Sequence, residues 1–260
     1  MSLDAAELGI LWPALVAGLL VTATHVPLGI QVLARGIVFI DLAVAQIAGL
    51  GVIFADWLGF EPHGLGVQAA ALAAAVAGAL VLTWTEKHWP EAQEAVIGVV
   101  FILAANLAIL LLAANPHGGE HLKDLLIGQV LWVKPSDLPP VAVASALIVA
   151  LWFGVGERFF GRIGFYLLFA CAITVSVQLV GIYLVFTTLI VPALATRRMS
   201  SGWLGRRRLG ACYLVGALGY AVGLGASLLT DLPPGPLIVC AMTALGYACF
   251  IAGPRQTLNT

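Results

Sequence analysis

Residues 163–196 read IGFYLLFACAITVSVQLVGIYLVFTTLIVPALAT, a run without Asp, Glu, Lys or Arg. A helix that crosses the hydrocarbon core of a bilayer needs about 20 largely apolar residues. The run is too long for one untilted span and short for two, and a helix would break at Gly181 or Pro192. This stretch therefore predicts helix inside a membrane, as one segment or as two.

The composition of the whole chain supports the same class. Of its 260 residues, 61% are hydrophobic and 10% are charged, whereas a soluble domain carries about 25% charged residues. No water-soluble fold of this size can bury that much apolar surface. We therefore predict an all-α, polytopic membrane protein with a single transmembrane domain over residues 1–260, and the charge pattern gives no support for nucleic-acid binding.

Apolar segments follow one another along the chain with short polar stretches between them. They lie at 8–33, 37–59, 65–85, 95–114, 139–156, 163–179, 181–196, 209–229 and 235–252. This gives nine transmembrane helices, or eight if the pair within 163–196 forms one span. Between residues 115 and 140 the sequence is mixed, and its second half has the spacing of an amphipathic helix that lies in the interface.

The basic residues predict the orientation, because cytoplasmic loops carry an excess of Lys and Arg. With alternating spans, the N-terminus lies outside and the C-terminus in the cytoplasm. The inner side then holds Arg35, Lys87, Arg158, Arg162, Arg197, Arg198, Arg206, Arg207, Arg208 and Arg255, and the outer side only Lys123 and Lys134. Several acids, including Asp231, fall on the outer side, where surplus carboxylates would attract cations.

Small residues gather inside the spans, in runs such as 69–78 and 216–225. Gly and Ala at a spacing of three or four allow helix backbones to approach closely in lipid. We expect these runs to pack helices against one another. The four cysteines, Cys171, Cys212, Cys240 and Cys249, form no close ligand pair, and we interpret them as small packing residues.

Asp41 is the leading candidate for a functional residue, because ionisable side chains within a span are costly and usually functional. It lies in IVFIDLAVAQIAG (37–49). One alternative is that Asp41 contributes to an ion path or its gate. The other is that it accepts hydrogen bonds from a neighbouring helix or pairs with Arg35. Gln46 lies about 140° further round the same helix, so the two side chains need not face one cavity.

Two further polar positions fall in the middle of predicted spans. His25 lies in TATHVPLG (22–29), where Pro27 frees a backbone carbonyl. Its imidazole is either a neutral group bonded to a Thr or to the freed carbonyl, or a metal ligand. Gln178, with Thr174 and Ser176 nearby, is explained by hydrogen bonding between helices or by a place on the path.

The predicted outer loop contains a group of possible metal ligands, which are His117, Glu120, His121 and Asp124. On a helix they would share one stripe and suit zinc or manganese, but Gly118 and Gly119 disfavour helix there. The segment matches the His-x-x-Glu-His pattern of inverted zinc proteases, which gives a rival hypothesis of a membrane metallopeptidase. The chain has no phosphate-binding Gly-x-x-x-x-Gly-Lys-Ser/Thr motif, so we expect another chain to hydrolyse any ATP.

Several segments together resemble the metal-uptake permeases of the ABC transporter superfamily, the zinc, manganese and iron class. The similar blocks occur in family order over most of the chain. They are PLGIQVLAR (27–35) with Asp41, AVIGVVF (95–101), DLLIGQVL (124–131), VGIYLVFTTLIVPALATR (180–197) and DLPPGPLIV (231–239).

The resemblance implies an importer of a divalent metal ion in the bacterial cytoplasmic membrane. Two permease copies, as a homodimer, would join cytosolic ABC ATPase subunits and receive the ion from an extracytoplasmic metal-binding protein, with no permanently bound cofactor. Residues 192–208 would contain the segment that couples to the ATPase. Its basic residues are Arg197, Arg198, Arg206, Arg207 and Arg208, and these also suit a topology signal facing anionic lipid.

One departure from the family concerns the metal path. In the family's second helix an aspartate is followed four residues later by a histidine, and the pair is taken to bind metal. Asp41 matches the aspartate, but Ala45 occupies the second position, with Gln46 beside it. His25 is a possible source of the missing nitrogen. Zinc and manganese are the expected substrates, and a metal chelate is the alternative.

Overall fold

The computed structural model describes residues 5–61, 64–112, 130–155, 157–199 and 203–253, and these contain helices but no β-strand. The long helices begin and end close to the predicted apolar segments. They are α1 (Ala5–Arg35), α2 (Ile40–Trp57), α3 (Leu65–His88), α4 (Gln93–Leu112), α6 (Leu138–Val155), α7 (Glu157–Val180), α8 (Ile182–Ala195), α9 (Trp203–Thr230) and α10 (Pro234–Ala252). Short 3₁₀ turns lie at Pro90–Ala92 (η1), Val130–Trp132 (η2) and Pro135–Asp137 (η3).

The stretch 163–196 is divided between two helices, and the break lies at Gly181, whereas Pro192 lies inside α8 and does not end it. Gly181 has φ +86°, a left-handed conformation that glycine adopts at little cost. Helix α8 has 14 residues, which span about 21 Å and fall short of a hydrocarbon core of about 30 Å. Within the described residues, 8 other helices are long and apolar enough to cross a membrane, so the predicted count of eight or nine depends on α8.

The helices form two compact groups. The first contains residues 1–35, 129–145 and 183–260, and the second contains 36–128 and 146–182. The expectation of one domain over residues 1–260 stays a prediction.

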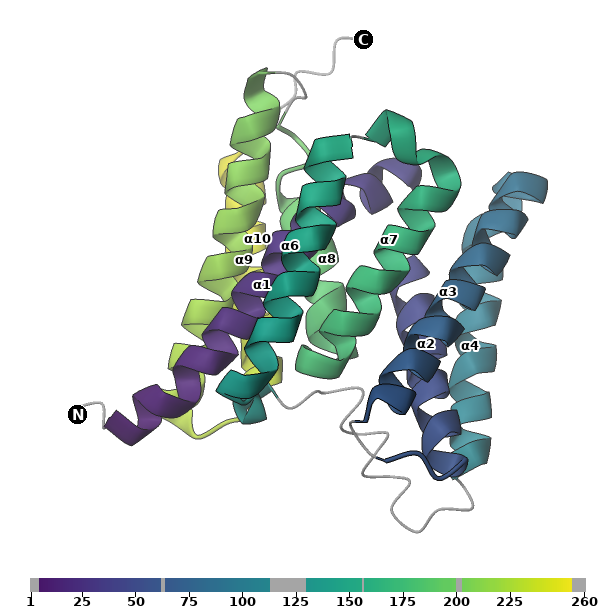
Figure 1. Ribbon diagram of the computed structural model, residues 1–260. Helices are drawn as coiled ribbons and strands as arrows, with labels where there is room; N and C mark the ends of the chain where they lie inside the picture. Colours follow the sequence, from purple (N-terminus) through teal and green to yellow (C-terminus); the bar gives the residue numbers. More distant parts are fainter. Residues whose placement is uncertain (1–4, 62–63, 113–129, 156, 200–202, 254–260) are drawn as a thin grey trace. The chain divides into compact units, whose positions relative to one another are not determined.

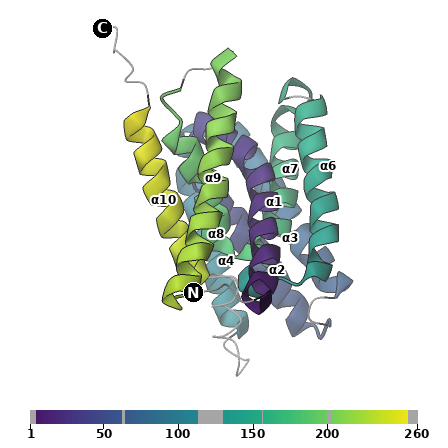
Figure 2. The ribbon, with the colours of Figure 1, turned by 90° about the vertical axis from the view of Figure 1, so that its left-hand side faces the viewer.

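In the first group, α9 packs against α1 and α10 (Figures 1 and 2). Three glycines of the run 216–225 explain this packing: a Cβ on Gly219 would lie 2.7 Å from the Cβ of Met242, and one on Gly216 would lie 2.7 Å from Thr22. Gly223 lies against Ile238 in the same way. The prediction that this run packs helices is confirmed.

In the second group, α2 packs against α3 and α4 (Figure 1), and α7 packs against α3. The small residues of 69–78 lie at the α2–α3 contact. A Cβ on Gly51 would lie 2.8 Å from the Cβ of Ala74, and Gly78 lies against Ile47. Close approach of α2 and α3 therefore depends on small side chains from both helices.

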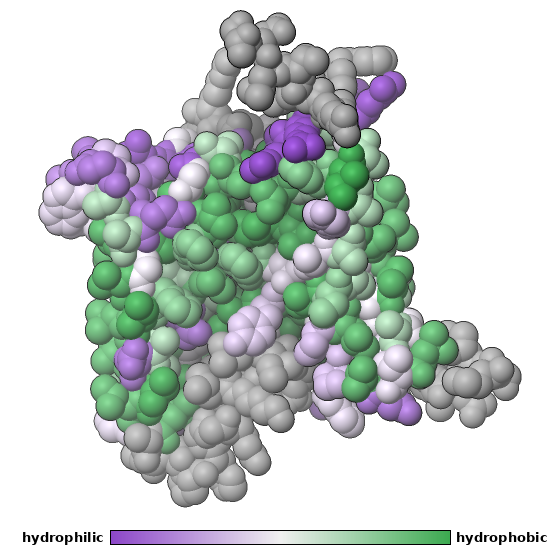
Figure 3. Space-filling view, turned by 180° about the vertical axis from the view of Figure 1, so that it is seen from behind, coloured by the Kyte–Doolittle hydropathy of each residue, from purple (hydrophilic) through white to green (hydrophobic). Residues whose placement is uncertain are grey.

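Large apolar side chains cover much of the described surface (Figure 3). Leu110 of α4 is 69% exposed and Leu147 of α6 is 59% exposed. A helix that is apolar on every side is typical of a membrane span. The surface therefore supports the membrane class predicted from composition.

Candidate functional site

Asp41 lies in the first turn of α2 and is 1% exposed. Among the described residues neither of its carboxylate oxygens has a hydrogen-bond partner, so the expected hydrogen bond to a neighbouring helix is not found there, while pairing with Arg35 stays a prediction. A buried carboxylate without a partner is strongly unfavourable. This carboxylate is thus suited to receive a cation.

The start of α2 is held by a residue that the sequence did not single out. Glu94, in the first turn of α4, accepts a hydrogen bond through Oε1 from the backbone N–H of Val38 at 2.7 Å. Phe39, at the N-cap position of α2, makes no side-chain capping bond. Glu94 therefore positions the turn that carries Asp41, and no local sequence signal links residues 56 positions apart.

Two other positions of α2 concern the histidine that the family has four residues after the aspartate and that this chain lacks. Gln46 is 6% exposed, and Ala45, one turn after Asp41, is fully buried. Residues four apart share a helix face. Ala45 therefore leaves the face of Asp41 without a second polar ligand from this turn.

His25 is fully buried in α1. Its Nδ1 lies 3.0 Å from the Val21 carbonyl oxygen and 2.9 Å from Thr24 Oγ1. A carbonyl oxygen can only accept, so a bond to Val21 places the hydrogen on Nδ1. The lone pair of Nε2 then has no partner among the described residues.

This geometry matches how proteins hold metal-binding histidines, whose second nitrogen usually donates to a carbonyl or carboxylate. The predicted bond to a Thr is present. The carbonyl freed by Pro27 is that of Ala23, and the Tyr213 hydroxyl donates to it at 3.1 Å.

Gln178 has an exposed side chain in α7. Thr174 is buried but donates to the Ala170 carbonyl of its own helix at 2.8 Å. The expected hydrogen bonding between helices at this cluster is therefore not found among the described residues. A place for Gln178 on the path stays a prediction.

The proposed coupling residues lie on both sides of residues 200–202. At the end of α8, the guanidinium carbons of Arg198 and Arg197 lie 3.9 Å and 5.3 Å from the centroid of the Phe250 ring of α10. Cation–π contacts of this kind contribute about 0.5–1 kcal/mol at exposed sites. Phe250 therefore fixes the direction of both arginines.

The second basic cluster lies in the first turns of α9. Arg206 and Arg207 are exposed, whereas Arg208 is partly buried. Nε of Arg208 is buried without a hydrogen-bond partner among the described residues. The two exposed arginines are the ones available to a partner.

Most of the predicted outer mouth lies outside the described residues, which applies to His117, Glu120, His121 and Asp124. The same is true of most of the predicted interfacial helix, while residues 130–132 form the 3₁₀ turn η2. Asp231 is exposed and has φ +54°. In the described part of the chain, no three His, Cys, Asp or Glu side chains come together as a metal-ligand set.

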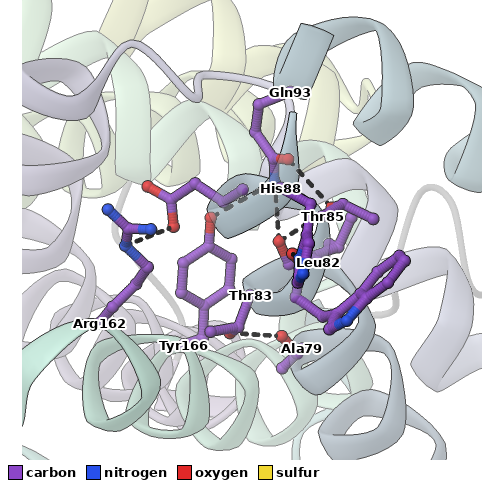
Figure 4. A network of polar contacts seen from close by, with 10 residues as sticks. Ala79, Leu82, Thr83, Thr85, His88, Gln93, Arg162 and Tyr166 are labelled. Carbon is purple, nitrogen blue, oxygen red and sulfur yellow. Dashed lines mark hydrogen bonds and ion pairs between the residues drawn. The ribbon is translucent and has the colours of Figure 1, made fainter. Parts of the chain in front are cut away.

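A buried polar network joins α3, α4 and α7, and the sequence did not single it out (Figure 4). The Gln93 side chain bonds Thr85 Oγ1 and the Leu82 carbonyl at 3.0 Å, and the Tyr166 hydroxyl at 3.5 Å. Gln93 thereby satisfies polar groups at the corner between α3 and α4. This network holds the helix that carries Glu94.

The family of the chain follows from its match to a known family model. The model of the ABC 3 transport family matches residues 7–161 and 154–252. The chain belongs to the ABC 3 transport family. All the candidate site residues named above lie within the matched segments.

The relatives that match the chain are distant but cover most of it. The "Probable iron transport system membrane protein" of Haemophilus influenzae is 24% identical, over 84% of this chain and 80% of that protein. The "High-affinity zinc uptake system membrane protein ZnuB" of the same species is 22% identical, over 88% of this chain and 92% of that protein.

A solved structure has a similar fold. PsaBC from Streptococcus pneumoniae, in complex with Fab, has a TM-score of 0.77 at 18% identity, covering 95% of this chain and 93% of that chain. The all-α importer-permease fold predicted from the sequence is confirmed. The chain is an integral, multi-pass membrane protein.

Proposed function

We propose that this chain is the membrane-spanning permease subunit of an ATP-driven importer of a divalent metal ion. Family membership supports the transport class, and the names of the iron and zinc relatives support a metal as substrate. Zinc or manganese is the proposed substrate. ATP hydrolysis is assigned to separate cytosolic subunits.

One observation carries the assignment of the path: the Asp41 carboxylate is buried with neither oxygen bonded among the described residues. A passing divalent cation would supply the missing interaction. Because only carboxylate and amide oxygens lie on this helix, harder ions such as manganese suit it. His25, whose Nε2 has no hydrogen-bond partner among the described residues, is proposed separately as a nitrogen ligand for zinc.

The proposed assembly contains two copies of the chain, cytosolic ATPases and an extracytoplasmic metal-binding protein. Arg206 and Arg207 are exposed and are the proposed ATPase contacts, together with the arginine pair beside Phe250. The N-terminus would lie outside and the C-terminus in the cytoplasm of a bacterial inner membrane. His117, Glu120, His121, Asp124 and Asp231 would form the outer mouth.

Two alternatives remain from the sequence. A metal chelate as substrate would require a wider path than a bare ion. The metallopeptidase rests on residues 117–121 alone, and the family match over residues 7–252 favours the permease.

Metal uptake by cells provides the test. The chain is expressed with its ATPase and binding protein, and accumulation of radioactive zinc and manganese is measured with and without the ATPase. We expect uptake of at least one ion that disappears when the ATPase is omitted. Equal accumulation without the ATPase, or metal-dependent peptidase activity of the purified chain, would overturn the proposal.

A further inference from the structure

An open cavity of about 540 Å³ lies between α3 and α7, both of the second helix group. Its size falls within the range of about 300–1,000 Å³ typical of small-molecule sites. Lys87 and Arg162 supply its basic groups, and Leu80, Trp84 and Ile163 supply apolar wall. The function proposed above uses none of these residues.

The Arg162 guanidinium lies beside the Glu86 carboxylate and is partly exposed. Nε of Arg162 lies 3.4 Å from Glu86 Oε2, and the Arg162 side chain is 49% exposed (Figure 4). The guanidinium has five N–H donors in a planar fork. The contact to Glu86 is made through Nε, and because half of the side chain is exposed, a ligand can reach the terminal nitrogens, which arginine uses for bidentate contact with a phosphate.

The backbone at Gly161 and Arg162 adds to the positive electrostatic potential in the cavity. Gly161 has φ +57° and ψ −160°, which interrupts α7. The helix resumes at Arg162, and the positive end of a helix dipole favours anions. Among the described residues that line the cavity, Lys87 and Arg162 are basic and none is acidic, so the lining carries a net positive charge.

The apolar residues that line the cavity indicate what kind of anion it can bind. Leu80 is 46% exposed and Ile163 is 56% exposed, and Leu80 lies about two helical turns, roughly 10 Å, from Lys87 along α3. An apolar ligand segment can therefore extend along the helix from the basic end. Trp84 is 52% exposed and packs edge-to-face on Trp89 with ring centroids 5.2 Å apart, and tryptophan is enriched at the membrane interface.

We infer that this cavity binds the headgroup of an anionic phospholipid. Arg162 and Lys87 bind the phosphate, Trp84 lies at headgroup level, and an acyl chain lies along Leu80 and Ile163. Basic pockets between transmembrane helices are known to bind anionic headgroups. A soluble partner such as an ATPase would reach the basic end but not Leu80, which lies within the apolar span Leu65–His88.

Native mass spectrometry of the purified full chain in detergent provides the test. Phosphatidylglycerol and phosphatidylcholine with the same acyl chains are titrated separately. We expect the chain to retain phosphatidylglycerol preferentially, and Lys87→Gln/Arg162→Gln to weaken its binding about tenfold or more, since each basic residue near a membrane surface adds about 1 kcal/mol. Lys134→Gln, which removes another exposed basic side chain away from the cavity, is the control and should bind like the parent.

Glu86→Gln should change phosphatidylglycerol affinity in the opposite direction from the double variant. It removes the only carboxylate paired with Arg162 among the described residues, so phosphatidylglycerol binding should become tighter, an effect that misfolding would not produce. Unchanged phosphatidylglycerol affinity in the double variant overturns the proposal. Displacement of phosphatidylglycerol by an equal concentration of inorganic phosphate also overturns it, because it indicates a site for free anions. The third contrary result is a double variant that loses ATPase binding but keeps lipid binding, which assigns this surface to a protein partner.

Discussion

The Tyr213 hydroxyl of α9 donates a hydrogen bond to the backbone carbonyl of Ala23 in α1, at 3.1 Å. Pro27 has no N–H, so it cannot bond the carbonyl four residues before it. That carbonyl is the one of Ala23. The proline that interrupts the bonding of α1 is therefore compensated by a side chain from another helix of the same group.

Tyr213→Phe should lower the stability of the folded chain. The substitution keeps the ring and removes a partly buried hydrogen bond, and a hydrogen bond of this kind contributes about 0.5–1.5 kcal/mol. Thermal unfolding in detergent measures the effect as a lower Tm. Tyr247→Phe is the matched control, because Tyr247 is 67% exposed, and equal Tm values for the two variants would contradict the assigned role.

Gly29→Ala should destabilise the contact between α1 and α8. A Cβ on Gly29 would overlap the carbonyl oxygen of Leu189, which is backbone and cannot rotate away. Overpacking of this kind costs about 1–3 kcal/mol. Gly225→Ala is the control, since no described atom lies within 4 Å of its Cβ position, and only Gly29→Ala should reduce Tm and the yield of folded protein.

The sequence predicts which residues form helices, because apolar length and helix breakers are local properties. The break at Gly181 illustrates this: a charge-free run too long for one span must turn, and a φ of +86° needs a glycine. The packing role of 216–225 is equally local, since it depends only on the spacing of small residues.

Contacts between helices are where sequence reasoning falls short. Glu94 bonds Val38, Gln93 approaches Tyr166, and neither pair is close along the chain. A single sequence shows that Glu94 follows a loop, but not which helix start it will cap. For Gln178 the sequence suggested a contact that the structure does not have: a polar residue within an apolar run suggested a buried partner, but the side chain is exposed.

The orientation prediction can be checked with reporters and labels. A reporter fused after Thr260 should be cytoplasmic, and one inserted within residues 116–120 should be external, because basic residues concentrate on the predicted inner side. A cysteine placed at Arg207 should resist a membrane-impermeant reagent added from outside. Labelling of that cysteine from outside would show that the topology is the reverse of the predicted one.

Arg206→Ala/Arg207→Ala should weaken binding of the ATPase and its stimulation by the permease. Both side chains are exposed, so their removal should change stability by no more than about 0.5 kcal/mol. Arg208 is left in place because it is partly buried. Co-purification and ATPase assays measure the effect, Lys134→Ala serves as control, and unchanged association would leave these arginines only a role in topology.

Asp41→Asn and Asp41→Leu separate a path role from a packing role. The native carboxylate is buried, with neither oxygen bonded among the described residues, and replacing a buried charge by a group of similar volume is often neutral or stabilising. Both variants should therefore keep or raise the Tm measured in detergent, while zinc and manganese uptake falls to background. The amide keeps the shape of the side chain and removes only the charge that a divalent cation needs, so charge is the isolated variable. A packing role predicts the reverse: Tm falls, and uptake declines only in proportion to the folded protein. Parental uptake by Asp41→Asn at matched expression would place the path elsewhere, with His25 and Gln178 as the next residues to substitute.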